Sequence, residues 1–231
     1  MTEIEVSDLG QSLIQTLFRS ELPDITQDIA EVALDSFLSE GVFREVPIVD
    51  TIVRLGKTYA TIRDYFLLKK VLRFLGTVKE QTTHSERDAF AETLDADENY
   101  GRRVGETLLV LLDRYDHIDK SRLMALLFSG YLRQEIDHDD FFRLSTAIDH
   151  AFIADLYTML DYFAGKIPTE GPVASRVARN LYVSNLSDFY ILTEEQARQS
   201  GLDHPRIYGF NRLAKQMAKI ILRDRLHPDF E

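Results

Sequence analysis

The sequence predicts a predominantly α protein, an irregular multi-helix bundle that ends in a small C-terminal α+β element. Apolar residues recur at intervals of three and four along most of the chain, which is the spacing of helices that bury one face. Short polar side chains of the helix-capping type stand before several of these stretches. The pattern changes after a breaker cluster of Pro168, Gly171 and Pro172, where two short β-favouring runs follow. We therefore expect a helical bundle over residues 1–167 and a small subdomain packed on it over residues 168–231.

The composition is that of an ordinary globular protein. The chain has 231 residues, of which 45% are hydrophobic and 28% charged, and this length allows one large core. Its net charge is −11 and its pI is about 5.0, so nucleic acid is not an expected partner, because phosphate-backbone binding needs a basic surface. The absence of cysteine excludes disulfides, thiolate nucleophiles and thiolate zinc sites.

The sequence also indicates where the protein works. The first residues include Glu3 and Glu5 and lack a basic segment followed by an apolar core, so they do not read as a signal peptide. No window approaches the roughly 18 consecutive apolar residues that a membrane-spanning helix needs. We expect a cytoplasmic protein, with any membrane contact peripheral and at the inner face of the membrane.

The first half of the chain is expected to be mostly helical. A short helix passes through Leu13 and Leu17, and a second begins at Asp24 and ends near Gly41, since glycine suits a left-handed C-terminal cap. From Ile48 to Phe66 the apolar side chains fall within one arc of a helical wheel, whereas in 68–75 they fall on the opposite side. One straight helix cannot bury both arcs against a single neighbour. We therefore expect either a bend near Arg63–Tyr65 or a long helix that passes through two packing environments.

Three further helices are predicted in the middle of the chain, at 102–116, 120–132 and 139–165. The second is apolar nearly all round, as in a helix enclosed by neighbours, and it predicts the centre of the core. Helix starts are expected where a capping side chain is followed three residues later by a second acceptor. These pairs are Ser85 with Asp88, Asp137 with Asp140, and Thr193 with Gln196.

The last part of the chain predicts a helix, a hairpin and a helix. The first helix runs through Val173 and Leu181, the β-favouring runs are Phe189–Leu192 and Arg206–Phe210, and the closing helix is Asn211–Arg225. This order resembles the last part of a winged-helix module. The resemblance implies a structural likeness and not DNA binding, because the basic recognition helix that reads DNA is absent.

The stretch Gly41–Gly76 is basic although the chain is acidic. It carries seven Lys and Arg residues against three Asp and Glu residues, a net charge of +4, so the rest of the chain carries −15. A basic helical face is suited to an acidic partner helix, a second copy of this acidic chain or an anionic membrane surface, and it is also what a solvated bundle helix presents. The candidate partner- or membrane-binding residues are Arg54, Lys57, Arg63, Lys69, Lys70 and Arg73.

Two interhelical loops, 113–119 and 135–140, are rich in Asp and His. Carboxylate and imidazole groups are ligands for divalent ions. His138 and Asp139 resemble the adjacent His–Asp pair of the HD-type metal phosphohydrolases, which implies a metal-dependent hydrolase, but the further ligands of that family have no convincing match in spacing. Asp near a helix start also caps free N–H groups, and this explains both loops without a metal.

No motif of an established catalytic type occurs: neither a G-x-S-x-G elbow, nor a glycine-rich phosphate loop, nor an H-E-x-x-H pair. We therefore expect no catalytic residue, metal or cofactor. The leading hypothesis is a non-enzymatic interaction or regulatory protein whose basic helical face binds an acidic protein partner or a second copy of the chain. The alternatives are a peripheral membrane-acting bacterial toxin, immunity or phage-defence component, and a metal-dependent hydrolase at the two Asp/His loops.

Overall fold

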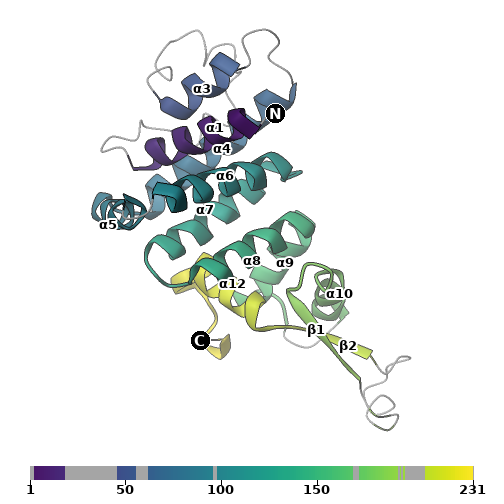
Figure 1. The fold of residues 1–231 in the computed structure, drawn as a ribbon. Helices are drawn as coiled ribbons and strands as arrows, with labels where there is room; N and C mark the ends of the chain where they lie inside the picture. The colour runs from purple at the N-terminus through teal and green to yellow at the C-terminus, as the bar shows by residue number, and fades with distance from the viewer. Residues whose placement is uncertain are drawn as a thin grey trace. The chain divides into compact units, whose positions relative to one another are not determined.

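A computed structural model confirms the predicted fold class: the chain is mostly helical, with one two-stranded antiparallel sheet near the C-terminus (Figure 1). The structure describes residues 3–18, 46–55, 62–95, 98–168, 172–191, 193, 195 and 206–230. The helix predicted from Asp24 to Gly41 lies outside these residues. The chain divides into two compact units, residues 1–134 and 135–231, whereas the sequence places a boundary at residue 167.

The first unit is helical in all its described parts. Helix α1 packs along α6, and α4 packs along α7, so these two pairs form the body of the unit (Figure 1). The shorter α3 packs on α1, and α5 packs on α6 and α7. The helices are α1 (Glu3–Leu17), α3 (Pro47–Leu55), α4 (Ile62–Gln81), α5 (His84–Asp95), α6 (Glu98–Arg114) and α7 (Ile118–Leu132).

Helices α1 and α6 approach each other through two glycines. A Cβ added to Gly105 would lie 2.3 Å from the carbonyl oxygen of Gly10, and a Cβ added to Gly10 would lie 2.8 Å from the backbone nitrogen of Glu106. Both contacts are with backbone atoms, which have little freedom to move away. The crossing therefore depends on the missing side chains at these two positions.

The described parts of the basic stretch form two helices, α3 and α4. Ile48 and Ile52 of α3 are buried, and the apolar residues 68–75 of α4 are buried on the opposite side of the wheel. Two separate helices can bury the two apolar arcs against different neighbours, which one straight helix could not do. Phe66 belongs to the first apolar arc by its spacing, but it lies on α4 and is 55% exposed.

The core of the first unit lies where α7 was expected to place it. From Leu123 to Leu132 every residue of α7 is buried, because its neighbours enclose it on all sides. The ring of Phe128 lies 5.5 Å from that of Phe74 on α4 and 6.1 Å from that of Phe90 on α5. The aromatic contacts join α4, α5 and α7 into one core.

The capping residues agree only in part with the expected pairs. Helix α5 begins with a capping box at Thr83 and Glu86, in which Thr83 N–H donates to Glu86 Oε2 (2.7 Å) and Glu86 N–H donates to Thr83 Oγ1 (3.2 Å). The predicted box at Ser85 is therefore wrong by two residues. Asp137 caps its helix as predicted, since its Oδ1 accepts from the Asp140 N–H at 2.8 Å. The pair predicted at 193 and 196 is not described in full.

The second unit contains four helices and the sheet in its described parts. The helix predicted over 139–165 is two helices, because Ala151 and Phe152 adopt extended backbone angles between them. Phe152 follows Ile148 at the four-residue spacing of the apolar side chains, yet it is 75% exposed. The apolar spacing continues across the break between the two helices, so the sequence gives no sign of the break. The helices are α8 (His138–His150), α9 (Ile153–Phe163), α10 (Pro172–Asn180) and α12 (Arg212–Leu222), followed by the 3-10 turns η3 (Arg223–Arg225) and η4 (Pro228–Phe230).

The predicted order of helix, hairpin and helix is confirmed. Strand β1 (Ser187–Ile191) pairs with β2 (Arg206–Phe210) in an antiparallel register that places Phe189 opposite Tyr208. Helix α10 packs mainly on β2, and α8 and α9 pack with α12, which is why these two helices group with the C-terminal part of the chain. Among the described residues, no helix has both the length and the apolar character needed to cross a bilayer.

Candidate functional site

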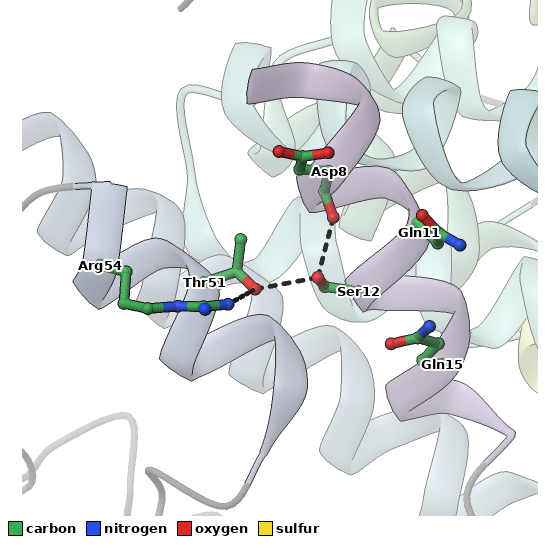
Figure 2. A pocket seen from close by; sticks show the side chains of 6 residues that line it. All are labelled: Asp8, Gln11, Ser12, Gln15, Thr51 and Arg54. Carbon is green, nitrogen blue, oxygen red and sulfur yellow. Dashed lines mark hydrogen bonds between the residues drawn. The ribbon is translucent and has the colours of Figure 1, made fainter. Parts of the chain in front are cut away.

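A polar groove of about 360 Å³ lies between α1 and α3 and includes Arg54, the first of the six candidate residues (Figure 2). Asp8, Gln11, Ser12 and Gln15 contribute from α1, and Thr51 lies beside Arg54 on α3. The Arg54 side chain is 58% exposed, and its Nε lies 3.0 Å from Asp50 Oδ2, one turn earlier on the same helix.

The hydroxyl groups in this groove join the two helices. Ser12 Oγ and Thr51 Oγ1 face each other at 2.9 Å, and each also lies 2.8 Å from the carbonyl four residues earlier in its own helix. Each hydroxyl has one proton, so at any moment one of them donates across the groove instead of to its own helix. Among the described residues, no imidazole or carboxylate accepts a hydrogen bond from either hydroxyl. The arrangement fits a structural link between α1 and α3 and not a nucleophile with its base.

Arg63 and Lys70 both bind the C-terminal end of α6. Arg63 Nε donates to Asp113 Oδ1 at 3.1 Å, and its second nitrogen pairs with the other carboxylate oxygen, an interaction that raises the pKa of Arg63. Lys70 Nζ donates to the carbonyl oxygens of Asp113 (2.8 Å) and Tyr115 (2.9 Å). Helix ends leave carbonyl groups without intrahelical donors, and a cation there also suits the helix dipole.

Lys70 therefore has a different place from the one the sequence indicated. Its side chain is 7% exposed, and its ammonium is held by two backbone carbonyls. A buried ammonium in these contacts stabilises the packing of α4 on α6 and is not presented to a partner. Lys57 lies outside the described residues, so its position adds nothing to the site.

Lys69 and Arg73 lie one turn apart on α4, and both residues are partly buried. The Lys69 Nζ lies 4.7 Å from the ring centroid of Tyr65, in a cation–π contact. The Arg73 Nε is buried and has no hydrogen-bond acceptor in the described part of the chain. Neither side chain forms an ion pair with a described carboxylate. Phe66, Lys69 and Arg73 follow one another at intervals of three and four, so they form a continuous line on α4, which we call the α4 stripe.

The first Asp/His loop caps and supports α7. Its His117 Nδ1 accepts from the Asp119 N–H at 3.1 Å, which is a capping contact. Asp116 Oδ1 lies 2.6 Å from the Nζ of Lys120, whose side chain is only 1% exposed. Burial opposes ionisation of Asp116, but the hydrogen bond and charge of Lys120 outweigh it and lower the pKa of the carboxyl group.

The second Asp/His loop is likewise occupied by contacts within the second unit. Asp140 accepts from Gln216 Nε2 at 2.9 Å and lies 3.6 Å from a guanidinium nitrogen of Arg212. The ring of His138 packs against that of Phe142, with the ring centroids 4.6 Å apart. In the described ranges, no three His, Asp or Glu side chains gather closely enough to share a metal ion.

Sequence reasoning missed two arginines that cap the end of α4. Arg87 is 6% exposed, and its NH1 donates to the carbonyl (3.0 Å) and hydroxyl (3.2 Å) of Thr82. Arg133 NH1 donates to the carbonyl oxygen of Gln81 at 3.0 Å. The only sequence signal for these roles is a helix end in need of donors, and the sequence does not show which distant cation supplies them.

The chain was compared with protein-family models, with curated proteins and with solved structures, and none of the three comparisons finds a match.

Proposed function

We propose that the protein is a non-enzymatic interaction protein that binds an acidic protein partner through the α4 stripe. The proposal keeps Lys69 and Arg73 from the six basic candidates. It leaves out Lys70, whose ammonium is buried on α6, and it gives Arg54 and Arg63 a lesser role, because each already has a carboxylate partner.

A single observation carries the proposal: Lys69 and Arg73 have no ion pair with any described carboxylate, although the chain has 38 acidic residues against 27 basic ones. Two cations four residues apart on a helix repel each other, at a cost of a few tenths of a kcal/mol. The Arg73 Nε is in addition removed from water without an acceptor. An acidic partner would relieve the repulsion between the two cations, since a carboxylate accepts from an ammonium or a guanidinium in a charge-assisted hydrogen bond.

The apolar part of the α4 stripe favours a protein partner over a lipid surface. In the described residues of α3 and α4, Phe66 is the exposed large apolar side chain, whereas Ile48 and Ile52 are used in the core. An amphipathic helix that lies in a membrane presents a broad apolar face, and the described residues of α3 and α4 expose no such face. A single exposed aromatic residue beside two cations matches the small apolar anchors that protein interfaces use.

A fluorescent peptide provides the test. The peptide is an amphipathic helix of about 20 residues with two Glu four residues apart beside a Leu, and its control has Gln in place of both Glu. We expect salt-sensitive binding of the Glu peptide in fluorescence anisotropy, with K69E/R73E binding at least about tenfold more weakly. The matched variant R102E/R103E changes two exposed arginines of α6 by the same charge, and we expect it to bind as the wild type does.

Vesicles separate this proposal from its alternative. Co-sedimentation with phosphatidylcholine vesicles that contain about 30% phosphatidylserine reports binding to an anionic membrane. Binding to these vesicles without binding to the Glu peptide would replace the proposal by the membrane-acting alternative. Equal peptide binding by the wild type and K69E/R73E would remove the α4 stripe from the function.

A further inference from the structure

We infer that the acidic partner of the α4 stripe is the outer face of α5 in a second copy of this chain. The inference rests on the proposed function and names its partner. It follows from a cationic pair on α4 and an exposed acidic pair on α5, two helices of the first unit.

Helix α5 presents the counterpart of the α4 stripe. Its exposed Asp88 and Glu92 lie one turn apart, as Lys69 and Arg73 do on α4. The carboxylate of Asp88 lies 3.3 Å from His84 Nε2, and that imidazole offers a full charge only when it is protonated. Glu92 has no cation partner in the described part of the chain. The two carboxylates therefore repel each other along the helix, as the two cations of α4 do.

The spacings of the two faces match residue by residue. Each pair spans four residues, a rise of about 6 Å along the helix axis. Phe66 lies three residues before Lys69, and the small, exposed Ser85 lies three residues before Asp88. Two helices laid side by side in the same direction thus place Lys69 against Asp88, Arg73 against Glu92 and the Phe66 ring against a small side chain. No ion pair joins these residues within one copy, so both faces remain for another copy.

The expected complex is weak and depends on salt. Each ion pair is exposed, and such pairs contribute little one by one. Most soluble homo-oligomers are closed by twofold symmetry, and a symmetric dimer would use the two faces twice. We therefore expect a dimer that is favoured at low ionic strength and dissociates at high salt, since salt screens exposed charges beyond about 10 Å at 0.1 M.

A charge-swap experiment tests the inference on the full chain. Sedimentation velocity is measured for the wild type, K69E/R73E, D88K/E92K and a one-to-one mixture of the two variants, over about 5–300 µM protein at low salt. We expect each variant alone to dimerise at least about tenfold more weakly than the wild type. The mixture should recover association to within about threefold, because each variant supplies the face that the other has lost. The variant R102E/R103E, which has the same net charge as K69E/R73E, should behave as the wild type does.

The outcomes separate this inference from the proposed function. A wild type that stays monomeric over the whole range, or a mixture that does not recover, overturns the second copy as partner. If that wild type still binds the Glu peptide, the proposed function stands and another acidic protein is the partner; if it does not, both fail. If a charge reversal lowers the melting temperature, the neutral double variants K69Q/R73Q and D88N/E92Q are used instead. We expect both to lose association, and unchanged association would contradict the inference.

Discussion

The close crossing of α1 and α6 gives the most exact prediction for stability. The Cβ of a Gly105→Ala variant would lie 2.3 Å from Gly10 O and 2.8 Å from Ile14 Cγ1. A carbon and an oxygen normally stay about 3.3 Å apart, so the two helices must separate by about 1 Å. A gap of this size removes roughly a quarter to a half of the dispersion energy between the facing atoms.

The size of the effect follows from two opposing contributions. Overpacking against backbone atoms costs about 3 kcal/mol, the upper part of the usual range, because neither helix backbone yields as a side chain would. Alanine is better than glycine inside a helix by about 1 kcal/mol. We therefore expect Gly105→Ala to lower the free energy of unfolding by about 2 kcal/mol and the melting temperature by about 4–8 °C.

Gly101 of the same helix provides the matched control. A Cβ there would lie 3.5 Å from the Leu94 Cβ, which is an ordinary contact, so Gly101→Ala should raise the free energy of unfolding by about 0.5–1 kcal/mol. Both variants are compared with the wild type by circular dichroism in thermal and urea unfolding. The reasoning is refuted if Gly105→Ala is as stable as the wild type, or if the two variants shift in the same direction.

Three further predictions concern Lys70, Asp116 and Phe66. Lys70→Met should destabilise the protein by about 1–3 kcal/mol in urea unfolding, because two carbonyl oxygens at the end of α6 lose a donor; a stable Lys70→Met would mean that the cap contributes nothing. Asp116→Asn should cost less than about 1 kcal/mol at neutral pH, because the Asp116 side chain is 67% exposed and water screens its interaction with the buried ammonium of Lys120. The pKa of Asp116 is lowered in the folded protein, so its contribution to stability is present above the unfolded pKa of about 3.9 and is lost as the pH falls through the folded value. The difference in free energy of unfolding between the wild type and Asp116→Asn should therefore shrink in that acid range. A difference that stays constant with pH would contradict the assignment. Phe66→Ser should change the free energy of unfolding by less than about 1 kcal/mol, since the ring stays more than half exposed, while peptide binding weakens at least about fivefold; unchanged binding would exclude Phe66 as an anchor.

The helices could be predicted from the sequence because their evidence is local. The burial of α7 on all sides, the two apolar arcs of α3 and α4, and the hairpin before α12 all follow from spacing along the chain. The break at Phe152 could not be predicted in this way. Its apolar side chain continues the spacing of α8, and only the packing of the second unit decides that it faces solvent.

The candidate site could be predicted only in part, because a charge does not reveal its partner. Lys69 and Lys70 are neighbours with the same chemistry, yet one lies over the ring of Tyr65 and the other is buried on the end of α6. A helix places successive residues about 100° apart, so the packing of α4 on α6 and α7 separates them. The close crossing at Gly10 could not be predicted from the sequence either, since a glycine adds nothing to an apolar pattern.

Lys69 and Arg73 are proposed to contact carboxylates of the partner, and an exchange of charges on both sides tests this contact. The wild type and K69E/R73E are each titrated with the Glu peptide and with a version that has Lys in place of both Glu. The account predicts that the wild type prefers the Glu peptide and that K69E/R73E prefers the Lys peptide, each by at least about tenfold at low salt. An unchanged preference in K69E/R73E would contradict it.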